Sequence, residues 1–288
     1  MKQKIKYIFL ILLSFINLSY ADQSIQDRQK IISIGAGVTE LVVALGMEKQ
    51  LIATDSTSRR FVELYHIPSV GYQRNLNTEG ILSLQPDLLI GSEEMGPKDV
   101  IQQLKQAGIS IVELQNNKND VYDLLTHIMQ IGKVLQKRQE AENLVSNVKQ
   151  RIEKITQKNL TSMTALFLFL PDNRQVMAGG HHTSIDGMIQ LLKLKNIATE
   201  KEGYYAYSIE SALKAQPEVV LVAQRGLQQN IEHLFKDYPF LTQFQATKNH
   251  CIFTVDGQAL LGGFNLTSLT ESERIADQLK QNPQCHVL

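Results

Sequence analysis

A tyrosine and an arginine two residues apart, Tyr72 and Arg74, are the side chains of this sequence best suited to binding a hard metal ion. A phenol has a pKa of about 10 and is mostly protonated at neutral pH. Beside a guanidinium, or facing a ferric ion, it ionises more readily and becomes a hard oxygen ligand, as in tyrosinate-ligated haem proteins. A Tyr-x-Arg pair is also common at protein surfaces, where the amphipathic ring keeps its polar end in water. The two residues alone leave both interpretations open.

Two glutamates occupy equivalent places in a repeated segment. Glu79 precedes Pro86 by seven residues, and Glu210 precedes Pro217 by seven. Each proline leads into an acidic residue and an aliphatic run, DLLIGS and EVVLVA. An acid at the start of a short helix can simply interact with the helix dipole, an effect worth less than about 1 kcal/mol, or it can bind a partner. The repeat predicts two similar lobes facing a shared cleft.

Other polar and aromatic residues could also contact a ligand. The adjacent imidazoles of His181 and His182 could give iron a sixth ligand from the second lobe, or could form a polar loop before a helix. A tyrosine cluster and a basic pair suit the face of a porphyrin and its carboxylates. These residues are Tyr204, Tyr205, Tyr207, Arg59 and Arg60. Ordinary packing explains the tyrosines equally well, and a solvated basic turn explains the arginines.

Strand and helix signals alternate from residue 31 onward and predict an α/β fold. The first half is expected to hold strands at 31–35, 51–54, 88–91 and 109–114, and helices at 39–45, 77–84 and 99–107. The second half is expected to hold strands at 166–170, 219–222 and 252–255, and helices at 184–192 and 209–215. The last helix is expected to begin with a capping box formed by Ser268 and Glu271. The predicted fold class is two Rossmann-like lobes with mainly parallel sheets.

The longest helical pattern of the chain, from Asp120 to Gln157, lies between the two halves. It contains no proline, and its aliphatic residues recur every three or four positions. A single helix of this length would extend about 55 Å, so it is predicted to be a rigid strut between the lobes. The alternative is two helices broken near Gly132. The predicted organisation is a signal peptide at 1–21, an N-terminal lobe at 22–118, an interlobe helix at 119–158 and a C-terminal lobe at 159–288.

The N-terminus is predicted to be a cleaved export signal. Three lysines precede an apolar run at 7–18, and Ser-Tyr-Ala at 19–21 fits a small-x-small cleavage site. The apolar run is too short to span a membrane and no later segment approaches the required length, so the mature chain is not expected to be embedded in a membrane. Removing the signal takes away three of the 29 basic residues and leaves a net charge of about −3. No basic stripe remains, which argues against nucleic acid as a partner.

The cysteines and the absence of catalytic motifs narrow the function further. Only Cys251 and Cys285 are present; in an oxidising compartment they could form a disulfide, and two free thiols are the alternative. The sequence has no Gly-x-Ser-x-Gly or His-Glu-x-x-His motif, which disfavours an exported hydrolase. Two adjacent histidines cannot close a metal site alone, which disfavours a divalent-metal carrier. Neither an enzyme activity nor a catalytic cofactor is expected.

Several stretches resemble the periplasmic haem-binding proteins of bacterial haem-uptake ABC transporters. In the first half they include IISIGAGVTELVVALG, IPSVGYQRNLNTEGILSLQPDLLIGSEEMGP and LKQAGISIVEL. In the second half they include AGGHHTSIDGMIQLL, EGYYAYSIESALKAQPEVVLVA and VDGQALLGG. The resemblance covers most of the mature chain. Its VGYxR…EGxLSLxPD part is specific to the haem branch of a wider group that also carries cobalamin and ferric siderophores.

The resemblance implies a role for the most conspicuous residues. Tyr72 is similar in position to the tyrosine that ligates ferric haem through its phenolate, and Arg74 would hold that phenolate or a haem propionate. Glu79 and Glu210 match the acids that dock into arginine pockets of a two-fold symmetric permease. The histidine that supplies a second iron ligand in some members lies nearer to the strand end at 170–172, where this sequence has none. Tyr72 is therefore expected to be the only protein ligand to iron.

The function implied by the resemblance is that of a non-catalytic carrier. The protein would be a periplasmic monomer that captures haem as its transported ligand and delivers it to the dimeric permease of an inner-membrane ABC importer. The closest alternative keeps the fold and carries a ferric siderophore or cobalamin. A rigid connection between the lobes predicts that they close little on binding.

Overall fold

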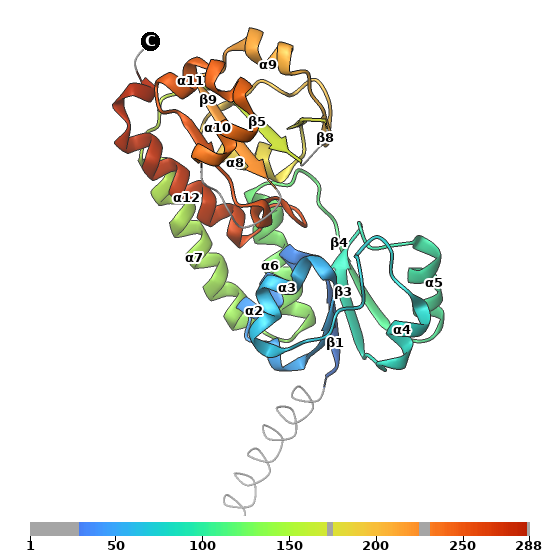
Figure 1. Ribbon diagram of the computed structural model, residues 1–288. Helices are drawn as coiled ribbons and strands as arrows, with labels where there is room; N and C mark the ends of the chain where they lie inside the picture. Colours follow the sequence, from blue (N-terminus) through green and yellow to red (C-terminus); the bar gives the residue numbers. More distant parts are fainter. Residues whose placement is uncertain (1–28, 172–174, 225–230, 287–288) are drawn as a thin grey trace, which may run out of the picture.

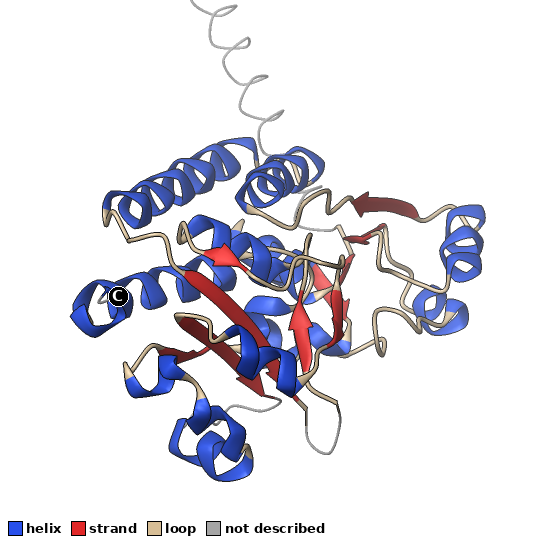
Figure 2. Ribbon diagram, turned by 90° about the horizontal axis from the view of Figure 1, so that it is seen from above, coloured by secondary structure: helices blue, strands red, loops and turns tan. Residues whose placement is uncertain are grey.

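The computed structural model describes residues 29–171, 175–224 and 231–286 as two lobes joined by helices (Figure 1). The predicted signal peptide, 1–21, lies outside these residues. Figure 2 shows that the strands lie inside the molecule and the helices around them. Among the described helices, none combines the length and the apolar character of a membrane span.

The N-terminal lobe is built on a four-stranded parallel sheet with the strand order β2-β1-β3-β4. Its strands are β1 (Ile31–Ile34), β2 (Leu51–Thr54), β3 (Leu88–Ser92) and β4 (Ser110–Leu114). The order changes direction between β1 and β3, because the chain adds β2 on one side of β1 and then β3 and β4 on the other. In open α/β sheets, ligands bind outside the carboxyl ends of the strands at such a point.

Helices cover both faces of this sheet, as expected for parallel strands. They are α2 (Ala36–Ala44), α3 (Arg59–Val62), α4 (Thr78–Ser83) and α5 (Lys98–Gln106). Successive strand residues point to opposite faces, so that Ile31 packs in the core shared with α2 while Ile32 packs in the core beside α4 and α5. Both residues are fully buried.

The C-terminal lobe contains a six-stranded mixed sheet. Its main path runs β10-β9-β5-β6-β8, and β7 (Lys195–Asn196) pairs with β5. On this path β5 (Thr164–Leu170), β9 (Val219–Gln224) and β10 (Ile252–Thr254) pair in parallel, whereas β6 (Met177–Gly179) pairs antiparallel with β5 and with β8 (Tyr204–Ala206). The predicted α/β class with two lobes is confirmed. The strands β6, β7 and β8 were not predicted, because they have only two or three residues and, unlike the equally short β10, are not runs of β-branched and aromatic residues.

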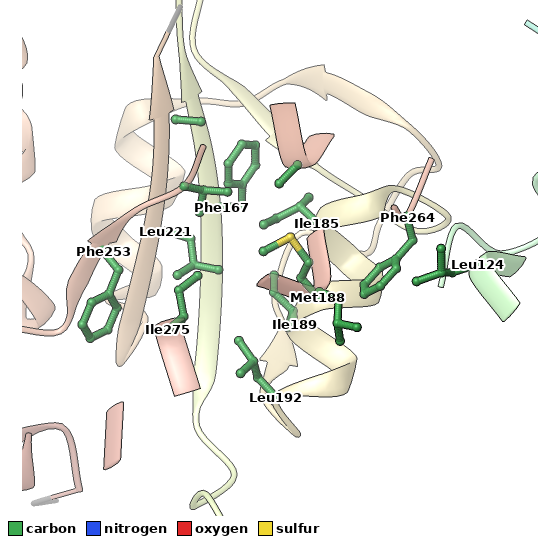
Figure 3. Packing of buried hydrophobic residues seen from close by; sticks show 14 of the residues in the cluster. Leu124, Phe167, Ile185, Met188, Ile189, Leu192, Leu221, Phe253, Phe264 and Ile275 are labelled. Carbon is green, nitrogen blue, oxygen red and sulfur yellow. The ribbon is translucent and has the colours of Figure 1, made fainter. Parts of the chain in front are cut away.

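The core of this lobe lies between the sheet and helix α8 (Ser184–Leu191). Figure 3 shows Phe167 of β5 and Leu221 of β9 facing Ile185 and Met188 of α8. The remaining helices of the lobe are α9 (Ile209–Ala215), α10 (Ile231–Asp237), α11 (Gln245–Lys248) and α12 (Leu266–Gln281). Short 3-10 turns occur in both lobes. In the first lobe they are Glu48–Gln50, Ser56–Ser58 and Glu63–Tyr65, and in the second they are Pro239–Gln243, Gly257–Leu260 and Pro283–His286.

The connection between the lobes consists of two helices, α6 (Val121–Val134) and α7 (Arg138–Gln157), so the prediction of one continuous helix was wrong. The break is a Schellman-type end to α6 in which Gln136 has a left-handed φ of 56°. The Lys137 amide donates to Gly132 O over 2.7 Å, and the Gln136 amide donates to Lys133 O over 3.3 Å. The alternative of a break near Gly132 is the one that the structure confirms.

Substituting Gly132 by alanine is expected to destabilise the protein. A Cβ at this position would lie 2.3 Å from the Ala141 Cβ, so α7 would have to move away from α6. We expect the free energy of unfolding to fall by about 1–3 kcal/mol, because overpacking outweighs a gain in helix propensity of about 1 kcal/mol. Urea denaturation measures the change, with Gly80→Ala as the matched helical control. The nearest atom to a Cβ on Gly80 is at an ordinary 3.4 Å. Equal stability of the two variants would contradict the prediction.

Helix α12 begins earlier than predicted. Its N-cap is Asn265, and the capping box joins Asn265 with Ser268 through bonds of 2.8 Å and 3.0 Å. The predicted box of Ser268 with Glu271 is therefore wrong by three residues. The side chain of Glu271 instead pairs with Arg274 and accepts a bond from the backbone amide of Asp256. The Asn-x-x-Ser pattern at 265–268 offers the same cap chemistry as the Ser-x-x-Glu pattern at 268–271.

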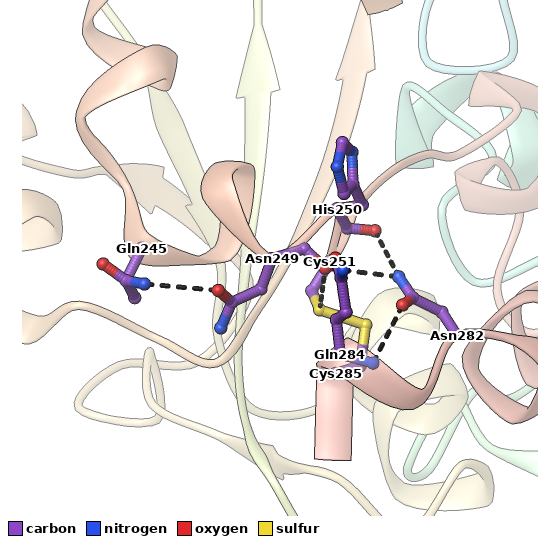
Figure 4. The surroundings of a disulfide bond; sticks show 7 residues. All are labelled: Gln245, Asn249, His250, Cys251, Asn282, Gln284 and Cys285. Carbon is purple, nitrogen blue, oxygen red and sulfur yellow. Dashed lines mark hydrogen bonds between the residues drawn. A yellow bond between two sulfur atoms is a disulfide. The ribbon is translucent and has the colours of Figure 1, made fainter. Parts of the chain in front are cut away.

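The disulfide between Cys251 and Cys285 is formed, with the Cα atoms 5.6 Å apart. Figure 4 shows that it ties the C-terminal turn to the loop before β10. The Asn282 side chain donates to the carbonyl oxygens of Asn249 and His250 over 3.3 Å and 2.9 Å, next to the bridge. The alternative of two free thiols is therefore not the one observed.

The two lobes are joined directly by Glu40 of α2. One of its carboxylate oxygens accepts the backbone amides of Leu266 and Thr267 over 2.8 Å and 3.3 Å, and the other accepts the Thr267 hydroxyl. A side chain of the first lobe thus satisfies amides at the start of α12 in the second. Burial raises the pKa of Glu40, and the hydrogen bonds from Thr267 and Leu266 oppose part of that rise.

Replacing Glu40 by glutamine is expected to remove a pH dependence of stability. The folded pKa is raised above the ordinary 4.5, so the folded protein holds this proton more tightly than the unfolded chain does. The contribution of the neutral carboxyl is complete below about pH 4.5 and is lost as the pH rises through the folded pKa. Between pH 4 and pH 7, urea denaturation should therefore show wild-type stability falling relative to Glu40→Gln. Glu48→Gln on the same lobe is the control; parallel pH profiles for all three proteins would contradict the expectation.

Candidate ligand site between the lobes

The parallel strands β1–β4 of the first sheet and β5 and β9 of the second run toward the boundary between the lobes, where their carboxyl ends face each other (Figure 1). After β1, a Cβ on Gly37 would lie 2.7 Å from Gly262 O of the second lobe, so the two backbones are in close contact there. After β2, Arg60 forms an ion pair with Asp256, which follows β10. The loops that carry the predicted site residues therefore start from facing edges of the sheets.

Tyr72 lies in a loop that crosses the carboxyl edge of the first sheet. Ser69 forms a bridge to Thr54 at the end of β2, and Gly71 O accepts the Ser56 amide over 2.7 Å. On the other side, the Gly96 amide donates to Gln73 O over 3.0 Å. These backbone bonds fix the loop at the ends of β2 and β3. The tyrosine itself is 49% exposed, and within the described part of the chain its hydroxyl has no hydrogen-bond partner. A fixed backbone with a free phenol suits a ligand-binding group.

Arg74 is held by a residue that the sequence analysis did not identify. Its guanidinium donates to Glu94 Oε1 over 2.8 Å, and the Gln73 side-chain amide donates to Glu94 Oε2 over 3.0 Å. Among the described residues Arg74 pairs with Glu94 and does not contact the Tyr72 phenol, and its contact with a phenolate or a haem propionate stays a prediction. Glu94 follows β3, and its position directly after an aliphatic strand was the signal that could have revealed it.

A buried carboxylate supports the turn that precedes Arg59 and Arg60, the first residues of α3. Asp55 is fully buried at the end of β2 and accepts bonds from the Gly35 amide over 2.8 Å and from the Ser58 hydroxyl over 2.5 Å. These bonds fasten the ends of β1 and β2 to the turn before α3. The side chain of Arg60 is engaged by Asp256, whereas Arg59 is exposed at the start of α3.

His181 and His182 lie at the end of β6, on the side of the second lobe that faces the first. His181 Nδ1 is 3.5 Å from the buried Asp186 Oδ2, and His182 Nδ1 is 3.4 Å from Glu202 Oε1. The carbonyl oxygen of His182 accepts the Asn119 side-chain amide over 2.6 Å. Both imidazoles are about half exposed, at 50% and 51%. A carboxylate beside Nδ1 favours a proton on that nitrogen and leaves Nε2 as the lone-pair donor.

The three tyrosines of the second lobe have different surroundings. The Tyr204 hydroxyl lies 3.2 Å from Ser184 Oγ, and burial together with the charge of Glu94 raises its pKa to about 12. Tyr204 therefore stays a neutral phenol at physiological pH. Tyr205 and Tyr207 pack edge to face against each other, with ring centroids 5.9 Å apart, and both are partly buried against the core of the second lobe. Of this predicted cluster, Tyr204 is the tyrosine whose pKa is raised by a charge of the first lobe, that of Glu94.

Glu79 and Glu210 occupy matching positions on the two lobes. Each lies in the first turn of a short helix, two residues after the N-cap, and each is exposed. The N-caps Asn77 and Ser208 accept the amides of the residues three positions later, over 2.7 Å and 3.3 Å. The sequence repeat is thus a structural repeat, with one exposed acid on each lobe.

Two α/β lobes, connected by helices and carrying polar and aromatic side chains on their facing edges, define a two-lobed binding protein. The chain matches the periplasmic binding protein family over residues 31–259 and belongs to that family. Within the described residues, no group of three or more His, Cys, Asp or Glu side chains is arranged to hold a metal ion.

Solved structures with this fold include haem-binding proteins. The periplasmic heme binding protein HutB of Vibrio cholerae is 38% identical, with a TM-score of 0.79 over 87% of this chain and 98% of that one. A periplasmic heme binding protein from Pseudomonas aeruginosa is 31% identical, with a TM-score of 0.78 over 88% of this chain and 93% of that one. The vitamin B12-binding protein of Pectobacterium atrosepticum is 27% identical over 67% of this chain and 71% of that protein.

Proposed function

We propose that this protein is a periplasmic carrier of ferric haem for an inner-membrane ABC importer, with Tyr72 as the iron ligand. The observation that carries the proposal is the half-exposed Tyr72 phenol, which has no described partner and stands on a backbone fixed at the edge facing the second lobe. Similarity to two haem-binding proteins over nearly their whole length supports haem as the cargo.

The residues around Tyr72 suit haem in complementary ways. Arg74 and Arg59 supply positive charge for the propionates, and Tyr204 supplies a neutral ring and hydroxyl from the opposite lobe. Arg60 would have to leave Asp256 to contact haem. His181 and His182 are the side chains through which the second lobe could supply a second iron ligand.

Carriage of cobalamin or a ferric siderophore is the second candidate, because a vitamin B12-binding relative spans two thirds of the chain. A direct titration separates the two. Ferric haem added to the apo-protein should give a saturable spectrum at one equivalent with a tyrosinate charge-transfer band, and cobalamin should give no saturable change. A low-spin six-coordinate spectrum would instead implicate His181 or His182. No saturable change with haem would reject the proposal.

A further inference from the structure

We propose that Glu94 is the positioning residue that aims the Arg74 guanidinium at the group bound by Tyr72. The inference rests on the proposed function and extends it to a residue outside the Tyr-x-Arg motif. It begins with the pairing of Glu94 to both residues that follow Tyr72, namely Gln73 and Arg74.

Glu94 is held through its carboxylate and through its backbone. Its Oε2 accepts the side-chain amide of Gln73, a residue that is only 6% exposed. The side-chain oxygen of Gln73 in turn lies against the end of β1, 3.1 Å from where a Cβ on Gly35 would be. The backbone amide of Glu94 is 3.4 Å from Ser92 Oγ. The carboxylate therefore has a defined position at the point between β1 and β3 where the strand order changes direction.

The ion pair itself contributes little to stability. The side chains of Arg74 and Glu94 are 58% and 35% exposed, and pairs of this kind are worth about 0–1 kcal/mol. Its geometry has a clearer consequence. A guanidinium carries five N–H donors in a planar fork, and the described bond to Glu94 uses one of them. Fixing that end leaves the rest of the fork oriented for a phenolate or a ligand carboxylate, which lowers the entropy lost on binding.

Glu94 could in principle act in the opposite direction. As a free negative charge near Tyr72 it would disfavour the phenolate and repel propionates, and its removal would then strengthen iron binding. Positioning and repulsion thus predict effects of opposite sign. Positioning and repulsion are separated by measuring the rate of haem loss together with the pH at which the tyrosinate band is lost.

The test is a double-mutant cycle on the haem-loaded protein with wild type, Glu94→Ala, Arg74→Ala and the double variant. The measurements are the rate of haem transfer to an excess of apomyoglobin and the pH at which the tyrosinate band is lost on acidification. Positioning predicts roughly tenfold faster haem loss for Glu94→Ala and a midpoint raised by about one pH unit. In the Arg74→Ala background Glu94 has no guanidinium to position, so removing it should neither speed haem loss nor raise the midpoint.

Glu113→Ala is the matched control, because the Lys105–Glu113 pair has nearly the same exposure, 51% and 34%, on the β4–α5 surface. It should leave haem loss and the acid midpoint unchanged. Slower haem loss or a lowered midpoint for Glu94→Ala would overturn the inference, as would equal effects with and without Arg74. If wild type gives no saturable haem spectrum, the proposed function fails and this inference fails with it. A wild-type spectrum with an additive cycle refutes the positioning role alone.

Discussion

Replacing Tyr72 by alanine is expected to abolish the tyrosinate haem spectrum and to weaken ferric haem binding by at least the 10- to 100-fold typical of perturbing a metal ligand's surroundings. Under the proposed function the phenolate is the only bond from the protein to iron, and the other contacts hold the periphery of the porphyrin. The loop should survive the change, because its fixing bonds are made by the backbone. Absorption spectroscopy and haem-transfer rates measure the effect.

Two further variants locate the effect in the hydroxyl. Tyr72→Phe keeps the ring and removes the oxygen, so it should lose the charge-transfer band while retaining part of the affinity. Tyr65→Ala removes a tyrosine of similar exposure, 47% against 49%, from the same lobe and should leave the spectrum unchanged. A wild-type spectrum from Tyr72→Phe would show that another group binds iron.

The helices and strands whose bounds were predicted well are those specified by residues within the element or directly beside it. The helix Ile209–Ala215 was predicted at its observed bounds, because Ser208 caps it and the chain leaves helical geometry just before Pro217. The strand β3 was predicted within one residue, since a run of aliphatic residues buried on both faces can hardly be anything else. Such signals lie within a few residues of the element that they specify.

Several of the contacts that were missed join residues that only the fold brings together. The close packing of Gly132 on Ala141, beside the break between α6 and α7, becomes visible only when the two helices are placed together. The same holds at the candidate site. The motif around Tyr72 was identified from the sequence. The partner of Arg74, however, is twenty residues away, and that of Arg60 is 196 residues away. Spacing within a motif therefore predicted which residues belong to the candidate site. The fold determined which side chains they contact.

The second large effect is expected at the docking acids. We propose that Glu79 and Glu210 bind the permease, because a two-fold symmetric dimer presents the same pocket twice and each lobe carries one exposed acid at the same helix position. Glu79→Lys with Glu210→Lys should reduce haem uptake to background, since like charges across an interface cost several kcal/mol. Each single variant should retain part of the uptake. Haem binding by the purified double variant should be unchanged, because both acids are exposed and neither contacts Tyr72 or Arg74 among the described residues.

Uptake can be measured as growth on haem as the sole iron source, with this chain as the only copy of the carrier. The control double variant is Glu63→Lys with Glu232→Lys, which reverses one exposed first-turn acid on each lobe and changes the net charge equally. Normal growth of the control together with loss of growth in Glu79→Lys/Glu210→Lys would assign the effect to the two positions. Equal loss in both would mean that overall charge drives the encounter with the permease, and normal growth in both would reject docking through these glutamates. Because haem binding is measured separately on the same proteins, each outcome concerns delivery alone.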